Sequence, residues 1–309
     1  MSELTGISQR HPLTSLIFIL LTTILGFLII GPILGFFMAM PFYAGSLFEL
    51  VEKIQNPLSH PEIKIPILIM QACATLFGLI AIPYLYLKGF ERVDPVQWLK
   101  SKSTPVVMVL VVALAVVSFM APNSLFIEWN ASIVFPEFLK EFGAWARERE
   151  DLAAELTRFF TTFDTTGEFL FGLVVIGLLP AVGEELVFRG MVQPELYRAT
   201  GNPHAAIWIS AILFSAFHMQ FFGFVPRMFL GALFGYLYVW SGNLWMPMIA
   251  HFVNNGFSVW MIYLYQTGTI TIDMESEEAA PWPLAAGLAI VFISLLYYFR
   301  KFHQTHPAS

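Results

Sequence analysis

Charge and cysteine are both scarce in this sequence. Asp, Glu, Lys and Arg make up 12% of its 309 residues, against the roughly 25% of soluble domains, which excludes an ordinary soluble globular protein. The single cysteine, Cys73, lies in an apolar run and excludes a disulfide framework or a zinc site built from several thiolates. No block of Lys and Arg marks a nucleic-acid-binding surface, so we expect no nucleic-acid partner.

Hydrophobic residues are abundant instead. They make up 57% of the chain, with 31 Phe, and the mean hydropathy is +0.69. This composition predicts an all-α polytopic membrane protein that lies mostly in lipid. Uncharged apolar runs predict a bundle of about eight transmembrane helices, at 16–42, 65–87, 104–121, 169–183, 204–222, 228–240, 244–265 and 283–299. Two pairs with G-x-x-x-G spacing, Gly31/Gly35 and Gly231/Gly235, predict close helix packing.

The chain divides near residue 168. Residues 1–168 are expected to hold N-terminal transmembrane helices and an amphipathic extramembrane segment, 122–168, and residues 169–300 a second group of helices. Apolar residues recur in this segment at helical steps, which fits a helix on the membrane surface or an ordinary packed surface helix. They are Phe138, Phe142, Trp145, Leu152, Leu156, Phe159 and Phe163.

The distribution of basic residues predicts the orientation. With eight spans both termini lie on one side, and the short loops carry nine Lys or Arg on that side against three on the other. The positive-inside rule therefore predicts an integral protein of the plasma membrane with both termini in the cytoplasm.

A few ionisable side chains remain in the apolar second half, where each is costly to bury and therefore informative. Glu184, Glu185 and Arg189 follow one apolar run. On a helix Glu185 and Arg189 are four residues apart and can form an ion pair. Glu184 is rotated by about 100° from Glu185, has no local counter-charge, and is the candidate general base.

Two imidazoles lie in the following runs. Phe214 precedes His218 by one helical turn, and His251 shares a helix face with Asn255. Each histidine alone is more often a packed, hydrogen-bonded residue than a catalytic one. Three helices that each contribute a carboxylate or an imidazole favour a shared site, where these groups can hold a water or a metal or donate to an oxyanion.

The three segments together resemble the CPBP family of intramembrane proteases, which includes the CAAX prenyl endopeptidases of the Ras-converting-enzyme type. The family pattern is E-E-x-x-x-R, F-x-x-x-H and H-x-x-x-N/D, and this chain carries all three in order between about 169 and 260. The resemblance implies a membrane-embedded endopeptidase whose catalytic core is residues 169–300. It assigns the catalytic residues to Glu184, His218, His251 and Asn255, and supporting roles to Glu185 and Arg189 with Phe214.

Two mechanisms are compatible with these residues. In the first, Glu184 and His218 activate a water, His251 and Asn255 stabilise the oxyanion, and no cofactor is required. In the second, Glu184, His218 and His251 bind Zn²⁺, which activates the water. The chain lacks H-E-x-x-H, so a zincin-like pair of ligands on one helix is absent. The glutamate-activated water is slightly favoured.

The expected spans do not assemble this site if they are straight. They place Glu184 and His251 near the cytoplasmic side but His218 about 20 Å into its span. Either the helix of His218 begins deep or tilts, or the chain turns back after Glu184, with breaks at Pro194 or at Gly201 to Pro203.

Other functions compete with the protease. A family member without proteolytic activity would be a membrane scaffold or immunity protein, and intramembrane Glu and His also occur in proton-coupled transporters. We expect the lipid bilayer and a peptide or lipidated protein as partners. A CAAX substrate would lose the three residues after a prenylated cysteine, while bacteriocin precursors and other membrane-anchored peptides are further candidates.

Overall fold

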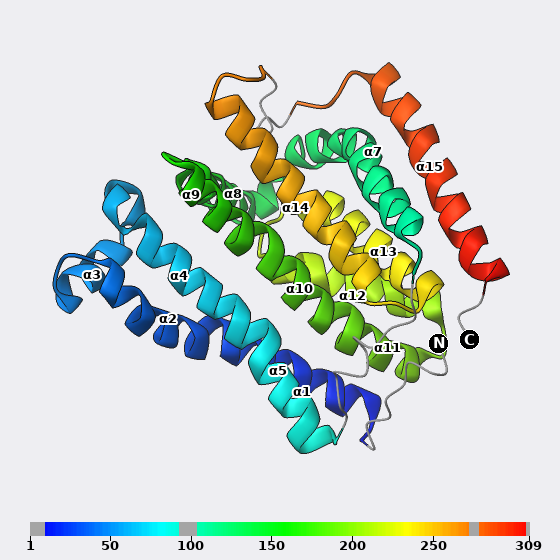
Figure 1. Cartoon of the computed structure of the whole chain (residues 1–309), viewed down its shortest axis with the longest axis horizontal. Coiled ribbons are helices and arrows are strands. Elements are labelled where there is room, and N and C mark those ends of the chain that lie inside the picture. Colours follow the sequence, from blue (N-terminus) through cyan, green and yellow to red (C-terminus); the bar gives the residue numbers. More distant parts are fainter. Residues whose placement is uncertain (1–9, 93–103, 272–277, 307–309) are drawn as a thin grey trace.

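The computed structural model describes residues 10–92, 104–271 and 278–306, and this part of the chain contains helices and no strands (Figure 1). The all-α prediction is thereby confirmed. The α-helices are α1 (Pro12–Leu25), α2 (Gly31–Ala39), α3 (Leu47–Ile54), α4 (Lys64–Thr75), α5 (Ile82–Tyr86), α7 (Val106–Ala131), α8 (Lys140–Thr161), α9 (Thr166–Gly172), α10 (Leu179–Glu185), α11 (Gln193–Thr200), α12 (Pro203–Phe217), α13 (Phe224–Ser241), α14 (Trp245–Gln266) and α15 (Trp282–Thr305).

Several of these helices join into longer ones through π-helical segments. Four such segments, η1 (Gly26–Ile30), η5 (Leu76–Ala81), η8 (Leu173–Leu178) and η9 (Leu186–Val192), each end two residues before a proline. Proline has no N–H and its ring clashes with the carbonyl four residues earlier, so the preceding turn widens. The result is three continuous helices, Pro12–Phe42, Pro61–Glu91 and Thr166–Thr200.

The first two long helices pack closely against each other, as the two blue and cyan helices of Figure 1 show. A Cβ added at Gly31 would lie 2.5 Å from the Ala74 Cα, and one at Gly35 would lie 2.7 Å from the Met70 Cα. The second glycine pair, Gly231 and Gly235, similarly lies against α12. Both G-x-x-x-G pairs therefore serve helix packing, as expected.

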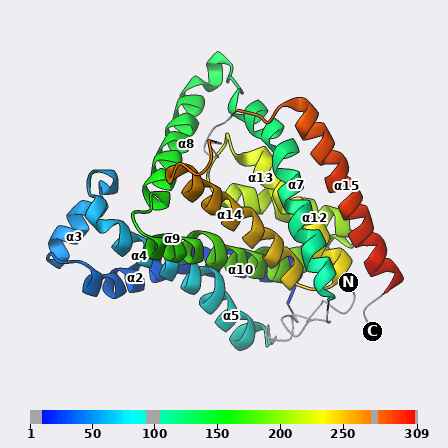
Figure 2. The same cartoon turned by 45° about the horizontal axis from the view of Figure 1, so that its top comes forward.

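The long helix Thr166–Thr200 lies between that pair and the remaining helices. Helix α1 packs on α11, helices α12 and α14 pack on the same long helix, and α7 pairs with α15 at the opposite edge. Helix α8 extends from the loop after α7 to the start of α9 and lies at the edge of the bundle (Figure 2). Only Ala146 and Thr161 of α8 are buried.

Within the described part of the chain, five helices are long and apolar enough to cross a membrane: Pro12–Phe42, Pro61–Glu91, Val106–Ala131, Thr166–Thr200 and Trp282–Thr305. Large apolar side chains such as Leu28 (63% exposed) and Ile290 (68% exposed) face outward on them, as lipid contact requires. The protein is an integral membrane protein. Each of the eight expected segments lies mostly within one helix, but the number of crossings and the orientation remain predictions. Lys100 and Lys102, used for that orientation, lie outside the described residues.

Two helix boundaries differ from the sequence prediction. Helix α7 continues through Pro122 to Ala131, so the amphipathic segment begins later than residue 122. The fourth helix does not end at residue 183 but continues to Thr200, and the chain reverses at Gly201, which has a left-handed φ of 65°.

This later reversal removes the expected mismatch in depth. Counted along the helices at 1.5 Å per residue, Glu184 lies about 24 Å from Thr200 and His218 about 22 Å from Pro203. The two residues are therefore level with each other on either side of the turn. Pro194 widens the helix without breaking it.

Candidate active site

Glu184 and Glu185 lie at the end of α10, a short α-helical segment between η8 and η9. Wide π-helical turns change the direction of the side chains that follow, and they are frequent at functional sites. Pro180 and Pro194 account for the two wide turns. The two glutamates therefore occupy a locally distorted part of an otherwise continuous helix.

Glu184 faces two imidazoles from different helices. Its Oε2 lies 4.0 Å from Nε2 of His218, which caps the end of α12, and 3.9 Å from Nε2 of His251 on α14. This oxygen is buried and accepts no hydrogen bond from any described residue. The His218 side chain is 28% exposed, whereas that of His251 is 5% exposed, so the cluster is open at His218. The structure brings together three of the four residues assigned to catalysis.

Hydrogen bonds at Nδ1 orient both imidazoles. Nδ1 of His218 lies 3.0 Å from the carbonyl oxygen of Phe214, and Nδ1 of His251 lies 2.8 Å from Oε1 of Glu185. Both partners are acceptors, so each Nδ1 donates, and in the neutral ring Nε2 keeps its lone pair. These lone pairs are on the side of each ring that faces Glu184.

Glu185 and Arg189 form an ion pair whose side chains are both 0% exposed. Nη1 of Arg189 donates to Oε1 of Glu185 at 2.8 Å, and Nη2 donates to the carbonyl oxygen of Gly231 at 2.7 Å. The same Glu185 oxygen accepts from His251. The pair therefore ties α10 and η9 to both α13 and α14.

Aromatic rings enclose the cluster. The ring of Phe214 contacts His218 and His251 edge-on, at centroid distances of 5.2 and 5.9 Å, and lies 4.7 Å from the Arg189 guanidinium. Phe234 stacks on His251 at 5.1 Å. These contacts are consistent with the supporting role expected for Phe214. Phe234, on α13, packs against His251 as a second aromatic ring of the cluster.

Asn255 lies one helical turn beyond His251, and its amide is engaged elsewhere. Its Nδ2 donates to the carbonyl oxygen of Ile176 at 3.4 Å, and its Oδ1 accepts from Nδ2 of Asn254 at 3.1 Å. Among the described residues it makes no hydrogen bond to Glu184, His218 or His251. Its role toward an oxyanion therefore remains a prediction and requires the amide to leave Ile176.

The sequence prediction missed Phe234 and Arg227. Arg227 is the one charged residue in α13, but the span was expected to start at Met228, which left Arg227 outside it. In the structure Arg227 is close enough to interact electrostatically with Glu184 and His218. The position of Arg227 directly before an apolar run was a signal in the sequence that could have identified it. No such signal marked Phe234, because the chain has 31 phenylalanines.

Glu184, His218 and His251 do not fit a zinc ion as they stand. Two ligand atoms on a tetrahedral zinc with bonds of about 2.0–2.1 Å lie about 3.3 Å apart, whereas the facing atoms here are separated by 3.9 and 4.0 Å. No group of three or more His, Cys, Asp or Glu among the described residues is arranged to hold a metal ion. The zinc mechanism remains an untested prediction.

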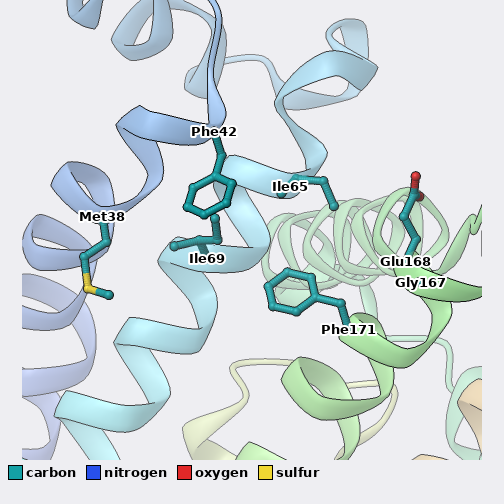
Figure 3. A pocket seen from close by; sticks show the side chains of 7 residues that line it. All are labelled: Met38, Phe42, Ile65, Ile69, Gly167, Glu168 and Phe171. Carbon is teal, nitrogen blue, oxygen red and sulfur yellow. The ribbon is translucent and has the colours of Figure 1, made fainter.

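A separate apolar pocket lies between α2, α4 and α9, with a cavity volume of about 450 Å³. Phe42, Ile65, Ile69 and Phe171 converge in it, and Glu168 lies at its edge (Figure 3). Glu168 pairs with Lys64 at 2.6 Å and precedes Glu184 by about 24 Å along the helix. The pocket is therefore distinct from the site of the paired glutamates.

Comparison with known proteins locates a family resemblance in the region of the site. Residues 166–257 match the sequence model of the family described as "Type II CAAX prenyl endopeptidase Rce1-like". This region includes all residues of the predicted site. No solved structure matches the chain.

Two relatives illustrate the extent of the similarity. The membrane-embedded CAAX protease MroQ of Staphylococcus aureus (strain USA300) is 38% identical over 97 residues, which cover 29% of this chain and 38% of MroQ. The uncharacterized protein YpbD of Bacillus subtilis (strain 168) is 32% identical over 85 residues, or 26% of this chain and 40% of YpbD. The matches thus span about two fifths of each relative.

Proposed function

We propose that this chain is an intramembrane endopeptidase of the CPBP family, as the match of its region 166–257 to the Rce1-like model supports. The observation that carries the proposal is the position of Glu184. A buried carboxylate oxygen without a hydrogen-bond donor faces two imidazole Nε2 atoms at 3.9 and 4.0 Å. These separations are too long for direct hydrogen bonds and suit one water bound between the groups.

We propose that Glu184 is the general base. It takes a proton from that water while the water oxygen attacks the scissile carbonyl carbon, and His218 orients the water from the open side of the cluster. The proton then passes to the leaving amine as the C–N bond breaks. Glu185 is unsuited to this step, because Arg189 and His251 both donate to it.

The proposed role of His251 and Asn255 is to stabilise the oxyanion. Because Nδ1 of His251 donates to Glu185, this ring can donate from Nε2 only when it is doubly protonated. The Glu185 carboxylate would stabilise that cation in the tetrahedral intermediate. Asn255 would supply a neutral donor from the next turn of α14.

We propose C-terminal CAAX processing as the reaction, with a prenylated peptide or protein as substrate. The Rce1-like match supports it, and the site lies in a bundle whose outer surface is apolar. The lipid-facing surface would allow a prenylated chain to approach from within the bilayer.

The test is cleavage of a farnesylated CAAX peptide by the detergent-purified protein, with product masses read by mass spectrometry. We expect loss of the last three residues. Glu184→Gln should lower kcat by about 10²–10⁴-fold, the range for removal of a general base, while Glu141→Gln, an exposed position on α8, should have no effect. No cleavage by the wild-type protein, or an active Glu184→Gln, would contradict the proposal.

A further inference from the structure

Arg227 lies in the first turn of α13, outside the motifs of the candidate active site, and its hydrogen-bond partner Gln220 follows His218 by two residues. Nη2 of Arg227 donates to Oε1 of Gln220 at 2.9 Å. The other terminal nitrogen, Nη1, is buried and donates to no acceptor among the described residues. The guanidinium group therefore keeps one buried terminal nitrogen whose N–H groups have no acceptor among the described residues.

The two carboxylates nearby do not use this donor. Arg227 is within electrostatic range of Glu150 on α8 and of Glu184 on α10. Glu150 accepts instead from Nε2 of Gln220 and from the backbone N–H of Phe222, both at 3.1 Å. Oε2 of Glu184 accepts no hydrogen bond from the described residues.

The surrounding loop holds the guanidinium in place. Gln220 bridges Glu150 and Arg227, and Asn130 at the end of α7 accepts from the backbone N–H of Val225 at 2.9 Å and donates to the carbonyl oxygen of Phe221 at 3.2 Å. The loop between α12 and α13 is thus fixed by two other helices. This rigidity makes Arg227 a preorganised binding group rather than a mobile side chain.

A buried, charged donor left without a partner destabilises the folded protein, because its desolvation is not compensated. A bound anion would remove this cost, and the planar guanidinium fork matches a carboxylate in particular. In a peptide the anions are the C-terminal carboxylate and the Asp and Glu side chains. Arg227 is within electrostatic range of the proposed base, so it would hold the end of the chain a few residues away from the bond that is cut.

We propose that Arg227 binds the C-terminal carboxylate of the substrate and so selects a cleavage site near a free chain end. This inference rests on the proposed protease function and deepens it. Gln220 acts as a positioning residue, since it holds Nη2 and leaves Nη1 free. The protein would therefore act on C-terminal segments rather than on internal loops.

Peptide binding to a catalytically inactive variant tests the role of Arg227 separately from catalysis. A dansylated, farnesylated peptide ending in Val-Ile-Met is titrated, as its free acid and as its amide, into the full-length Glu184→Gln protein in detergent. We expect the acid to bind at least about tenfold more tightly, as a hydrogen-bonded ion pair provides. Adding Arg227→Gln should reduce this ratio to about one, Arg227→Lys should retain part of it, and Arg149→Gln on exposed α8 should leave it intact.

Other outcomes would overturn the inference. The inference is overturned if the Glu184→Gln protein binds the acid and the amide with equal affinity, or does not bind the acid. It is also overturned if the preference for the acid over the amide persists after Arg227→Gln. An amidated peptide with Asp as its last residue that binds as tightly as the acid would assign Arg227 to acidic side chains instead. A wild-type protein that binds the acid selectively but cuts neither peptide would contradict the protease function alone.

Discussion

His251 donates from Nδ1 to Oε1 of Glu185 at 2.8 Å, so the second glutamate of the motif orients an imidazole on another helix. This bond connects α10, which carries the two glutamates, to α14, which carries His251. It also determines which ring nitrogen of His251 faces Glu184. Glu185 therefore holds the geometry of the site without being free to act as a base.

Glu185→Gln should accordingly reduce turnover without removing the base. The amide keeps an acceptor for His251 but loses the charge that stabilises the imidazolium and pairs with Arg189. Loss of a carboxylate that orients a metal-binding histidine typically costs about 10–100-fold, and Glu185 orients His251 through the same kind of hydrogen bond. We expect kcat to fall by that factor with KM little changed, measured by steady-state peptide cleavage. A kcat equal to that of the wild type would show that Glu185 does not orient His251 functionally.

Arg189→Leu should destabilise the whole fold. Removing one partner of a buried ion pair leaves an uncompensated charge and typically costs about 3–5 kcal/mol, and both side chains here are 0% exposed. The free energy of unfolding in mixed micelles, measured by denaturant titration, should fall by about this amount. Arg149→Leu, at an exposed position on α8, is the matched control and should change it by less than about 0.5 kcal/mol. Equal stability of the two variants would contradict the buried pair.

Gly31→Ala should loosen the N-terminal helix pair. The new Cβ would lie 2.5 Å from the backbone of Ala74, and the two helices would have to separate. Overpacking of this kind typically costs about 1–3 kcal/mol. Gly287→Ala on α15 meets nothing within 4 Å and should be neutral or slightly stabilising. Thermal melting of the two variants in the same detergent compares them directly, and a stable Gly31→Ala protein would exclude tight packing there.

Removal of metal should leave peptide cleavage unchanged if Glu184 activates the water alone. The facing atoms of Glu184, His218 and His251 are farther apart than zinc ligands. Protein dialysed against a chelator is assayed with the CAAX peptide, and its zinc content is measured in parallel. Activity that disappears with the zinc and returns when zinc is restored would establish the metal mechanism instead.

The sequence was sufficient to predict an all-helical membrane protein and a cluster in which Glu184, His218 and His251 lie together. The hydrophobic composition indicates that most of the chain lies in lipid. The spacing of Glu185 and Arg189 on a helix predicts their ion pair. The all-α fold class is confirmed by the structure, and the resemblance to the family is supported by the match of residues 166–257 to the Rce1-like model. The catalytic roles remain predictions.

Other features required tertiary information. Hydropathy placed the end of the fourth helix before Glu184, because it treats each charge as exposed. The helix continues because Glu185 and Arg189 neutralise each other inside the bundle. The bond between His251 and Glu185 joins residues 66 positions apart, which no local pattern reports. Arg227 was overlooked because a boundary error of a few residues placed it in a loop.

For the proposed protease, the depth of Glu184 would limit which peptide bonds can reach it. Along its helix the carboxylate lies about 24 Å from the turn at Gly201, and an extended chain advances about 3.3–3.6 Å per residue. A strand that enters from that end must supply about seven unpaired residues between the bond to be cut and the nearest folded domain. The length of this unpaired segment would thus select among substrates, independently of the side chains around the cleaved bond.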